Sequence, residues 1–595
     1  MEAEASGQAP EGPARQLLNE QVALVRQQVL AQRIGNLLRL GTAALALVVA
    51  GLVGVVVWQA SRADGLVIKS FSVPPELAQR GVTGEAVASQ LLDKLAQVGE
   101  RAWTSERQRS VSADRGDNIA IEIPQTGVSL SQLDQWLREK LGRQTRLTGE
   151  VMLQPDGRLT LAARIGSEVL PSQTGTPAEL EAMLQRTAEA IYAHNQPRSY
   201  FDYLMRVGRL ADAEPLVRAA AADPDPDVRA WGFSGIGWVQ QAAGDPVAAL
   251  ASLRRAQALS ENSPGLNNLS IAEWNAGHAE TAIRLTRQLA ARALADDSRD
   301  PESRRNNALL TEARLSAYIG DSARALQIAE ELRRSKVLGY SAGRFVVFTP
   351  LIAGRTAVHD LNAARMELAD VGDHLVGRVA LAARIALVAE DWPQVLELGP
   401  RALEESRDAA INTRLRCSYS ALALVKLGRL PEAEAVLTET PLDSEPCVRV
   451  RAVAAEVAGD RRLADHWFGE AIRMAPSAPH AAAEWGRAKL ARGDRLGAVA
   501  LFAQAHRISP RYADATVGWG EALLAGGDAK EAAAKFAEAA KLAPRWGRLH
   551  LKWGEALAKL GKAAEAQAKW RAAAGMDLTA AERAELARVS PKRTL

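Results

Sequence analysis

The sequence contains one short motif whose letters match a catalytic serine turn. Residues 339–343 read Gly-Tyr-Ser-Ala-Gly, the G-x-S-x-G pattern that holds a nucleophilic serine between a strand and a helix in hydrolases. No strand pattern precedes these residues, which follow a helical segment ending near Arg334, and the downstream His359 and His374 do not by chain order make a catalytic triad. We therefore predict an inter-helix loop here, and a serine hydrolase that uses Ser341 is the less favoured alternative.

Other residue types that could carry chemistry are dispersed along the chain. The eight histidines form no HExxH or other metal-binding spacing, and no pair of carboxylates stands in a setting that would tune it for acid–base work. The glycines of residues 232–237 lie inside a helical pattern, whereas a phosphate-binding loop joins a strand to a helix. The sequence therefore predicts no enzyme, no cofactor or metal site, and no small-molecule substrate.

The composition indicates a large helical protein. The chain has 595 residues, of which 47% are hydrophobic, and it carries 73 basic and 70 acidic side chains. These fractions exclude wholesale disorder, and the near balance of charge argues against a strongly cationic nucleic-acid-binding protein. Aromatic residues, which favour strands, make up only 5% of the chain. The elements that position any functional residue are therefore expected to be mainly α-helices.

A 34-residue repeat accounts for most of the chain. Near the carboxyl end, five kinds of residue recur at this spacing: Trp485, Trp519 and Trp553; Gly493, Gly527 and Gly561; Ala498, Ala532 and Ala566; Phe502, Phe536 and Trp570; Pro476, Pro510 and Pro544. Small residues let paired helices approach closely, glycine permits the turn after the first helix, and proline ends the second. The pattern resembles the tetratricopeptide repeat (TPR), a helix-turn-helix unit.

The resemblance implies an α-solenoid of stacked helix pairs. The register extends backward with weaker matches, and it predicts about ten or eleven units over residues 177–578. Between about residues 336 and 405 the register is weak, and Glu390 is the best candidate there for a turn position. Residues 579–595 are predicted to form a capping helix and a tail, because the last apolar face of such an array needs a cover.

Residues 40–61 form an apolar run without any ionisable side chain. As a helix this run would be about 33 Å long, which suffices to cross the hydrocarbon core of a bilayer. Residues 1–39 are predicted to be a cytoplasmic leader with an amphipathic helix. Three arginines before the run, against two basic residues after it, favour an inside amino terminus. We therefore expect a single transmembrane helix, with the bulk of the chain in the periplasm.

The segment from 65 to 175 has a mixed pattern, with the predicted order β-α-β-α-β-β. Strands are expected at 65–74, 118–124, 146–153 and 158–165, and helices at 83–97 and 129–141. Pro155-Asp156-Gly157 is typical of a hairpin turn. The order, together with the stretch 137–165, resembles the small α/β domain at the amino terminus of TolB. Similar domains precede repeat arrays in bacterial proteins related to adenylate-cyclase regulators, which implies an interaction or assembly module.

The two cysteines fall on the first helices of neighbouring repeat units. Adjacent units bring such helices together, so Cys417 and Cys447 could form a disulfide in an oxidising compartment. Their positions within the units differ slightly, and the two side chains are therefore expected to face different directions. Two buried free thiols are the preferred prediction.

The resemblance to TPR proteins also implies a binding groove, because fixed positions of the first helices line its concave face in that family. In the last units these positions give a candidate peptide-binding set: His480, Arg487, Asp514, Glu521, Arg548, Glu555 and Lys559. Mixed charge beside small apolar residues suits an extended or helical peptide. The lysine/asparagine clamp of some family members is absent, since Ala483, Val517 and Leu551 occupy one of its positions. The alternative is that these charges only solvate the face.

Together, these expectations predict a membrane-anchored scaffold protein. The predicted partners are proteins or peptides of the bacterial cell envelope, bound in the groove of the solenoid. Arginine outnumbers lysine about fourfold, as in GC-rich bacterial genomes, which favours the bacterial inner membrane as the location. A cytoplasm-facing signalling regulator is the alternative, because of the resemblance to cyclase-associated repeat proteins.

Overall fold

The computed structural model of the chain describes residues 64–102, 111–113, 143–260, 264–295, 301–334, 340–371, 377–405 and 415–590, with a few isolated positions before residue 59. Within this part of the chain, no helix combines the length and the apolar character that crossing a membrane requires. The leader at 1–39 and the predicted span at 40–61 lie almost entirely outside the described residues, as do the strand predicted at 118–124 and the helix predicted at 129–141.

The chain divides into two compact units, residues 1–97 with 108–194 and residues 98–107 with 195–595. A small mixed sheet forms the first unit, with its strands in the order β2-β1-β3-β4-β5 and with β6 paired to β4. β1 is parallel to β2 and β3, whereas β3 and β4 are antiparallel. The elements of this unit are β1 (Asp64–Ile68), α2 (Pro75–Ala78), α3 (Gly84–Arg101), β2 (Val111–Ala113), β3 (Arg143–Leu153), β4 (Leu159–Ile165), β5 (Glu168–Val169), β6 (Gln173–Gly175), the 3₁₀ turn η1 (Pro177–Glu179) and α5 (Leu180–Asn195).

The hairpin of this sheet confirms the turn predicted at residues 155–157. Gly157 has a φ of 81°, a left-handed conformation that glycine adopts without steric cost. The backbone N–H of Arg158 donates to Asp156 Oδ1 at 3.0 Å, which closes the turn. The helical pattern at 83–97 is also present as α3, whose Leu91 is fully buried. The first strand is shorter than predicted, since β1 ends at Ile68.

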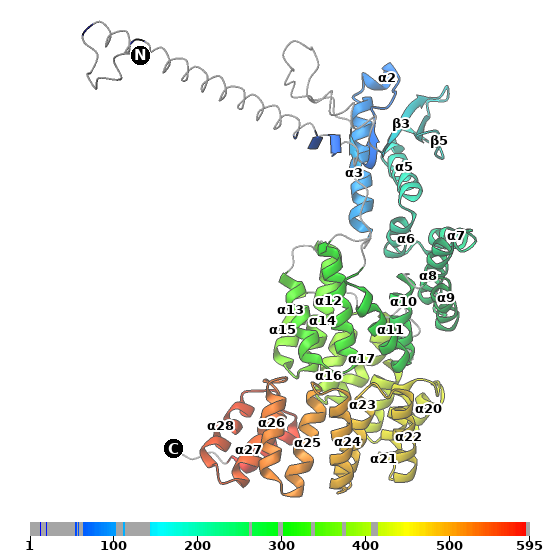
Figure 1. Cartoon of the computed structure of the whole chain (residues 1–595). Coiled ribbons are helices and arrows are strands. Elements are labelled where there is room, and N and C mark those ends of the chain that lie inside the picture. Colours follow the sequence, from blue (N-terminus) through cyan, green and yellow to red (C-terminus); the bar gives the residue numbers. More distant parts are fainter. Residues whose placement is uncertain are drawn as a thin grey trace, which may run out of the picture. The chain divides into compact units, whose positions relative to one another are not determined.

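The second unit is an array of helix pairs (Figure 1), as the 34-residue spacing predicted. Its described residues form eleven pairs followed by one cap: α6 (Pro197–Arg206) with α7 (Leu210–Ala221), α8 (Pro226–Ala242) with α9 (Pro246–Leu259), α10 (Pro264–Ala276) with α11 (Ala279–Arg292), α12 (Pro301–Tyr318) with α13 (Ser322–Arg334), α14 (Tyr340–Ala357) with α15 (Leu361–Val371), α16 (Arg378–Val388) with α17 (Trp392–Glu405), the π-helical turn η2 (Arg416–Ala421) and α19 (Leu422–Lys426) with α20 (Leu430–Thr438), α21 (Glu445–Val457) with α22 (Arg461–Met474), α23 (His480–Ala491) with α24 (Arg495–Ile508), α25 (Ala513–Gly526) with α26 (Ala529–Ala540), α27 (Gly547–Lys559) with α28 (Ala563–Ala574), and α29 (Ala580–Val589).

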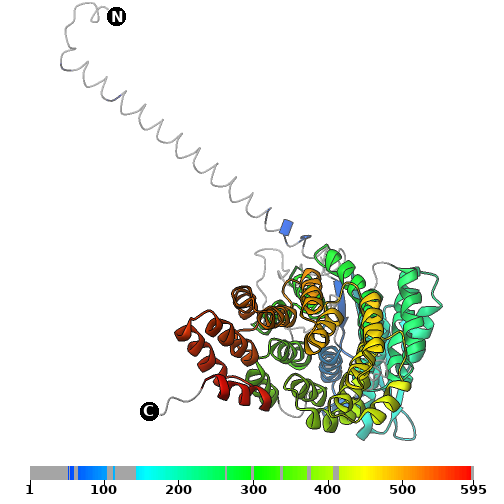
Figure 2. The same ribbon diagram turned by 90° about the horizontal axis from the view of Figure 1, so that it is seen from below.

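Large apolar side chains fill the space between successive pairs. Phe468, Phe502 and Phe536 stand 34 residues apart and are fully buried. The rings of Phe502 and Phe536 lie against glycines of the first helices: a Cβ on Gly518 would lie 2.3 Å from an atom of the Phe502 ring. The small and large residues of the repeat therefore fit together as the sequence pattern indicated. Consecutive pairs lie side by side in the view of Figure 2.

The turn between the two helices of a pair has a left-handed residue throughout the array. Glycine occupies it in most pairs, with φ between 76° at Gly208 and 100° at Gly527. His359 and Glu390 occupy it in two consecutive pairs, with φ of 59° and 56°. A non-glycine residue in this conformation costs about 1 kcal/mol. The register looks weak between residues 336 and 405 because the turn glycine, its clearest marker, is replaced there twice.

Earlier and later pairs of the array touch along one line, which we call the seam. It joins the turns after α10, α12 and α14, together with residues of α11 and α15, to the residues that precede or begin α21, α23, α25, α27 and α29. Four of its contacts are Glu445 N to Gly277 O at 3.0 Å, Ser477 N to Glu280 Oε2 at 2.8 Å, Arg511 Nε to Asp321 Oδ2 at 2.7 Å, and Arg365 Nη1 to Asp577 Oδ1 at 2.7 Å. The seam braces the solenoid by contacts between residues far apart in the sequence.

Candidate functional site

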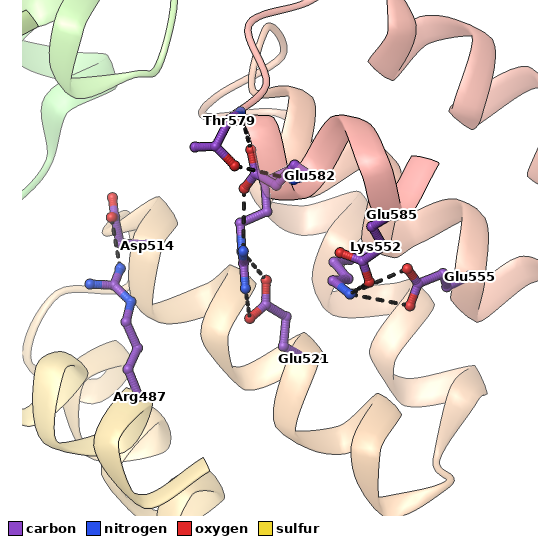
Figure 3. Close-up of polar contacts among 9 residues, drawn as sticks. Arg487, Asp514, Glu521, Lys552, Glu555, Thr579, Glu582 and Glu585 are labelled. Atoms are coloured by element: carbon purple, nitrogen blue, oxygen red, sulfur yellow. Dashed lines mark hydrogen bonds and ion pairs between the residues drawn. The ribbon is translucent and has the colours of Figure 1, made fainter. Parts of the chain in front are cut away.

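The seven residues of the predicted groove set lie on three neighbouring first helices. His480 and Arg487 belong to α23, Asp514 and Glu521 to α25, and the remaining three to α27: Arg548, Glu555 and Lys559. The structure brings most of their charged groups together as ion pairs that link one helix to the next (Figure 3). The 34-residue spacing thus placed these residues correctly on adjacent helices.

Two of these ion pairs have the same spacing in the sequence. Arg487 Nη2 donates to Asp514 Oδ1 at 2.9 Å, and the two residues are 27 apart. Arg548 binds Glu521 through two parallel hydrogen bonds, from Nε at 2.7 Å and from Nη2 at 3.0 Å, again across 27 residues. In the first pair the arginine lies on the earlier helix and the carboxylate on the later one, whereas in the second pair this order is reversed. We call this row of ion pairs between helices the charge ladder.

The ladder continues onto the capping helix through residues that the sequence analysis did not select. Arg548 Nη1 also donates to Glu582 Oε1 at 3.2 Å, and Lys552 pairs with Glu585 and, at 3.2 Å, with Glu555. Glu582 is fixed by the start of α29, where its carboxylate accepts from the backbone N–H of Thr579 at 2.8 Å. A search for opposite charges 27 or about 34 residues apart would have found these partners.

Burial and neighbouring charges set the ionisation of the ladder. Burial disfavours the charged form of Asp514, but the hydrogen bond to His359 and the guanidinium of Arg487 outweigh it and hold the pKa of Asp514 well below its usual range. The carboxylate of Glu521 raises the pKa of Arg548. Burial raises the pKa of Glu555 despite the ammonium group of Lys552. Asp514 is therefore ionised at neutral pH, beside the guanidinium of Arg487.

The last two members of the groove set also have partners inside the array. Lys559 Nζ donates to the backbone oxygen of Leu524 at 3.3 Å, and the ring of His480 meets Tyr512 edge-on with centroids 5.3 Å apart. Six of the seven residues therefore contact a neighbouring first helix or the residue that begins it, whereas Glu555 pairs with Lys552 of its own helix. Their role in binding a peptide stays a prediction.

One seam contact adjoins this ladder. His359 Nε2 lies 3.6 Å from Asp514 Oδ2, so Asp514 bridges the seam histidine and Arg487. The ring of His359 stacks on Trp546, with centroids 3.7 Å apart. No sequence pattern predicts this cluster, because His359 and Trp546 belong to units that are not consecutive.

Cys417 and Cys447 form a disulfide, so the prediction of two free thiols is wrong. Their Cα atoms are 5.2 Å apart, within the usual range for a bridge. Both cysteines are fully buried, Cys417 in η2 and Cys447 in the first turn of α21. The prediction assumed regular α-helices, whereas η2 is a π-helical turn, which redirects its side chains relative to an α-helix.

The motif around Ser341 lies in a different setting from a hydrolase turn. Residues 340–343 begin the helix α14, in an array of paired helices, and Gly339 lies outside the described residues. The predicted loop is therefore helical from residue 340 onward. Among the described residues, no group of three histidine, cysteine, aspartate or glutamate side chains could hold a metal ion.

No protein-family model matches the chain, and no curated protein matches it by sequence. Similar solved structures include MamA AMB-1 (20% identity over 28% of this chain and 91% of that chain, TM-score 0.22), the Cut9-Hcn1 hetero-tetramer of APC/C (11% identity, 69% and 90%, TM-score 0.36) and yeast Tom70 (13% identity, 65% and 93%, TM-score 0.31). These scores carry no argument about partners, and the mainly helical repeat architecture rests on the helix pairs themselves.

Proposed function

We propose that this protein is a scaffold that binds other proteins of the bacterial cell envelope through the first helices of its repeat array. The observation that carries the proposal is the array itself, in which helix pairs are linked by buried phenylalanines, by an inter-helix charge ladder and by the seam. A surface fixed in this way loses little conformational entropy when a partner binds. Stacked helical repeats offer such extended surfaces.

We further propose that the chain is anchored in the inner membrane by residues 40–61, with the array in the periplasm. The apolar run and its flanking arginines support this placement. The disulfide between Cys417 and Cys447 supports it independently, because disulfides persist in oxidising compartments and are rare in the bacterial cytoplasm. The same disulfide disfavours the cytoplasm-facing signalling regulator.

A reporter fused after Leu595 tests the placement. Alkaline phosphatase is active only in the periplasm, and green fluorescent protein exported in unfolded form fluoresces only in the cytoplasm. We expect phosphatase activity without fluorescence from full-length fusions. Fluorescence without phosphatase activity would contradict the envelope placement.

Purification of the full chain tests the scaffold role. After chemical cross-linking in intact cells, we expect envelope proteins to co-purify with the wild-type chain in reproducible stoichiometry. The matched control is a variant that carries Phe502→Ala and Phe536→Ala, which removes two buried rings and disorders the array while keeping the anchor. Equal recovery of the same proteins from both chains would show that the array does not bind them.

A further inference from the structure

Three consecutive first helices share a chain of polar contacts. Arg314 Nη2 on α12 donates to Asn267 Oδ1 on α10 at 2.6 Å. Asn267 Nδ2 donates to the neighbouring Asn268 Oδ1 at 3.3 Å, and Asn268 Nδ2 donates to Ser234 Oγ on α8 at 3.0 Å. These four side chains place amide groups and one guanidinium on a single face of the array, which we call the early face.

Arg314 differs from the arginines of the charge ladder, because within the described residues no carboxylate pairs with it. Its Nε is enclosed by the protein and has no acceptor there. Burial lowers the pKa of Arg314, and the only titratable group that acts on it in this part of the chain is the phenol of Tyr318. A partly buried guanidinium without a counter-charge is costly. A bound anion would remove that cost.

The repeat gives an internal comparison for this arginine. Arg314 stands six residues before its turn glycine, Gly320, and Arg487 stands six residues before Gly493. Arg487 has the carboxylate of Asp514 on the next first helix. The same position of the repeat therefore holds a neutralised arginine in one later unit and an arginine without a carboxylate partner in the earlier one.

The same repeat position supplies apolar groups on the two preceding helices. Trp238 on α8 stands six residues before Gly244, and its side chain is 42% exposed, which is unusual for tryptophan. Ile271 on α10 stands six residues before Gly277 and is half-buried. Along the early face, one row of equivalent positions thus reads tryptophan, isoleucine and arginine, beside the amides of Asn267 and Asn268.

We propose that the early face binds an extended peptide segment of a partner protein whose carboxylate pairs with Arg314. The guanidinium fork matches a carboxylate in two parallel hydrogen bonds, the asparagine amides bond to the peptide backbone, and Trp238 packs on an apolar side chain of the segment. A carboxylate carries one negative charge, which one guanidinium neutralises, whereas a phosphate carries nearly two. This inference rests on the proposed scaffold function and assigns it a site and a ligand chemistry.

Fluorescent decapeptides test the proposal with the full-length chain in detergent. One library fixes aspartate at a single position in random sequence, and a matched library fixes asparagine at that position, both with acetylated and amidated ends. A third library has asparagine and a free carboxyl end, which separates a side-chain source of the carboxylate from a terminal one. Fluorescence anisotropy measures the affinity of each library for the wild type, Arg314→Gln and Arg487→Gln.

We expect one carboxylate source to bind the wild type about tenfold more tightly than its amide counterpart. The preference should persist in Arg487→Gln, whose arginine is already paired, and should fall to less than about twofold in Arg314→Gln. Trp238→Ala should weaken all libraries alike and leave the preference unchanged. An unchanged or higher thermal unfolding midpoint of Arg314→Gln shows that this variant is folded.

A carboxylate preference that survives Arg314→Gln would overturn this inference and leave the scaffold function standing. So would the failure of every library to bind while envelope proteins still cross-link to the array. If the array cross-links to no envelope protein, the proposed function itself fails. The two failures are therefore distinguishable.

Discussion

His359 lies flat on Trp546, with parallel ring planes and centroids 3.7 Å apart. The histidine occupies a turn position with a φ of 59°, which glycine fills in most other helix pairs. The tryptophan precedes α27, in a later part of the array, and is buried. The seam thus includes a histidine in a left-handed backbone conformation, which is unfavourable for residues other than glycine. The stack on Trp546 and the contact to Asp514 offset the energetic cost of this conformation.

Two substitutions of His359 separate the stack from the backbone strain. His359→Ala loses the stack and the contact to Asp514, which should lower the free energy of unfolding of the array by about 1–2 kcal/mol. His359→Gly loses the same contacts and relieves the left-handed strain, so it should be less destabilising than His359→Ala by about 1 kcal/mol. Urea denaturation followed by circular dichroism measures both.

Glu390 is the control for this comparison. Its φ is 56° and its side chain is exposed, so Glu390→Gly should raise the free energy of unfolding by about 1 kcal/mol. Equal stability of His359→Ala and His359→Gly would show that the turn at residue 359 is not strained.

The seam should also weaken as the pH rises through neutrality, because of His278. Its Nδ1 lies 2.5 Å from Glu273 Oε2 and its Nε2 lies 3.4 Å from Asp443, and Glu273 also binds Arg254. The hydrogen bond to Glu273 raises the pKa of His278 above its usual value, although burial opposes the shift. A group whose pKa is higher in the folded protein contributes its full stabilisation of the fold below its unfolded pKa, which is about 6.5 for histidine. This contribution is lost as the pH rises through the folded pKa.

His278→Gln should therefore flatten part of this pH dependence. Between about pH 6 and pH 8, the unfolding temperature of the wild type should fall relative to that of His278→Gln. His466→Gln, which changes an exposed histidine, should follow the wild type. Parallel curves for the wild type and His278→Gln would contradict a protonated His278 in the seam.

Reduction of the disulfide should destabilise the array without unfolding it. Cys417 and Cys447 are 30 residues apart, and the entropy of closing such a loop corresponds to about 3–4 kcal/mol. A lower denaturation midpoint in the presence of a phosphine reductant, with no effect on a Cys417→Ala, Cys447→Ala double variant, would agree with this. Alkylation of both thiols in the non-reduced protein would contradict the bridge.

The pair between Glu521 and Arg548 should behave as an exchangeable ion pair. Glu521→Arg alone places two guanidinium groups together and should cost about 2 kcal/mol, whereas adding Arg548→Glu should recover about 1 kcal/mol of it, since Arg548 is 39% exposed. A double-mutant cycle by urea denaturation measures the coupling. Recovery should be partial, because Glu582 would then face a glutamate at position 548. Additive effects of the two substitutions would show that the pair contributes nothing.

The elements that repeat could be predicted from the sequence, because each is fixed by residues within one unit or its neighbour. Phe502 and Gly518 stand at constant spacing and meet in the core between two pairs. The groove set was placed on the correct helices for the same reason. Its mutual pairing was not predicted, since the spacing of 27 residues between Glu521 and Arg548 follows from how one helix faces the next.

The seam could not be predicted, because it depends on how far the solenoid turns per pair. Small differences in this turn accumulate over the several units between Asp321 and Arg511, and no local sequence pattern predicts the total turn. The disulfide was missed for a local reason, since the π-helical turn at Cys417 breaks the regular geometry that the prediction assumed. Arg314 was not predicted, because the repeat pattern that selects groove positions is clearest in the last units.

Site-specific photo-cross-linking in living cells tests most directly whether the first helices bind proteins. Benzoylphenylalanine replaces Trp238 on the early face or, as the matched control, Val247 on the second helix α9, whose side chain is 78% exposed. We predict a covalent adduct with an envelope protein from position 238 that disappears with Arg314→Gln, and none from position 247. Adducts of equal yield from both positions, or none from position 238, would contradict protein binding through the first helices of the early face.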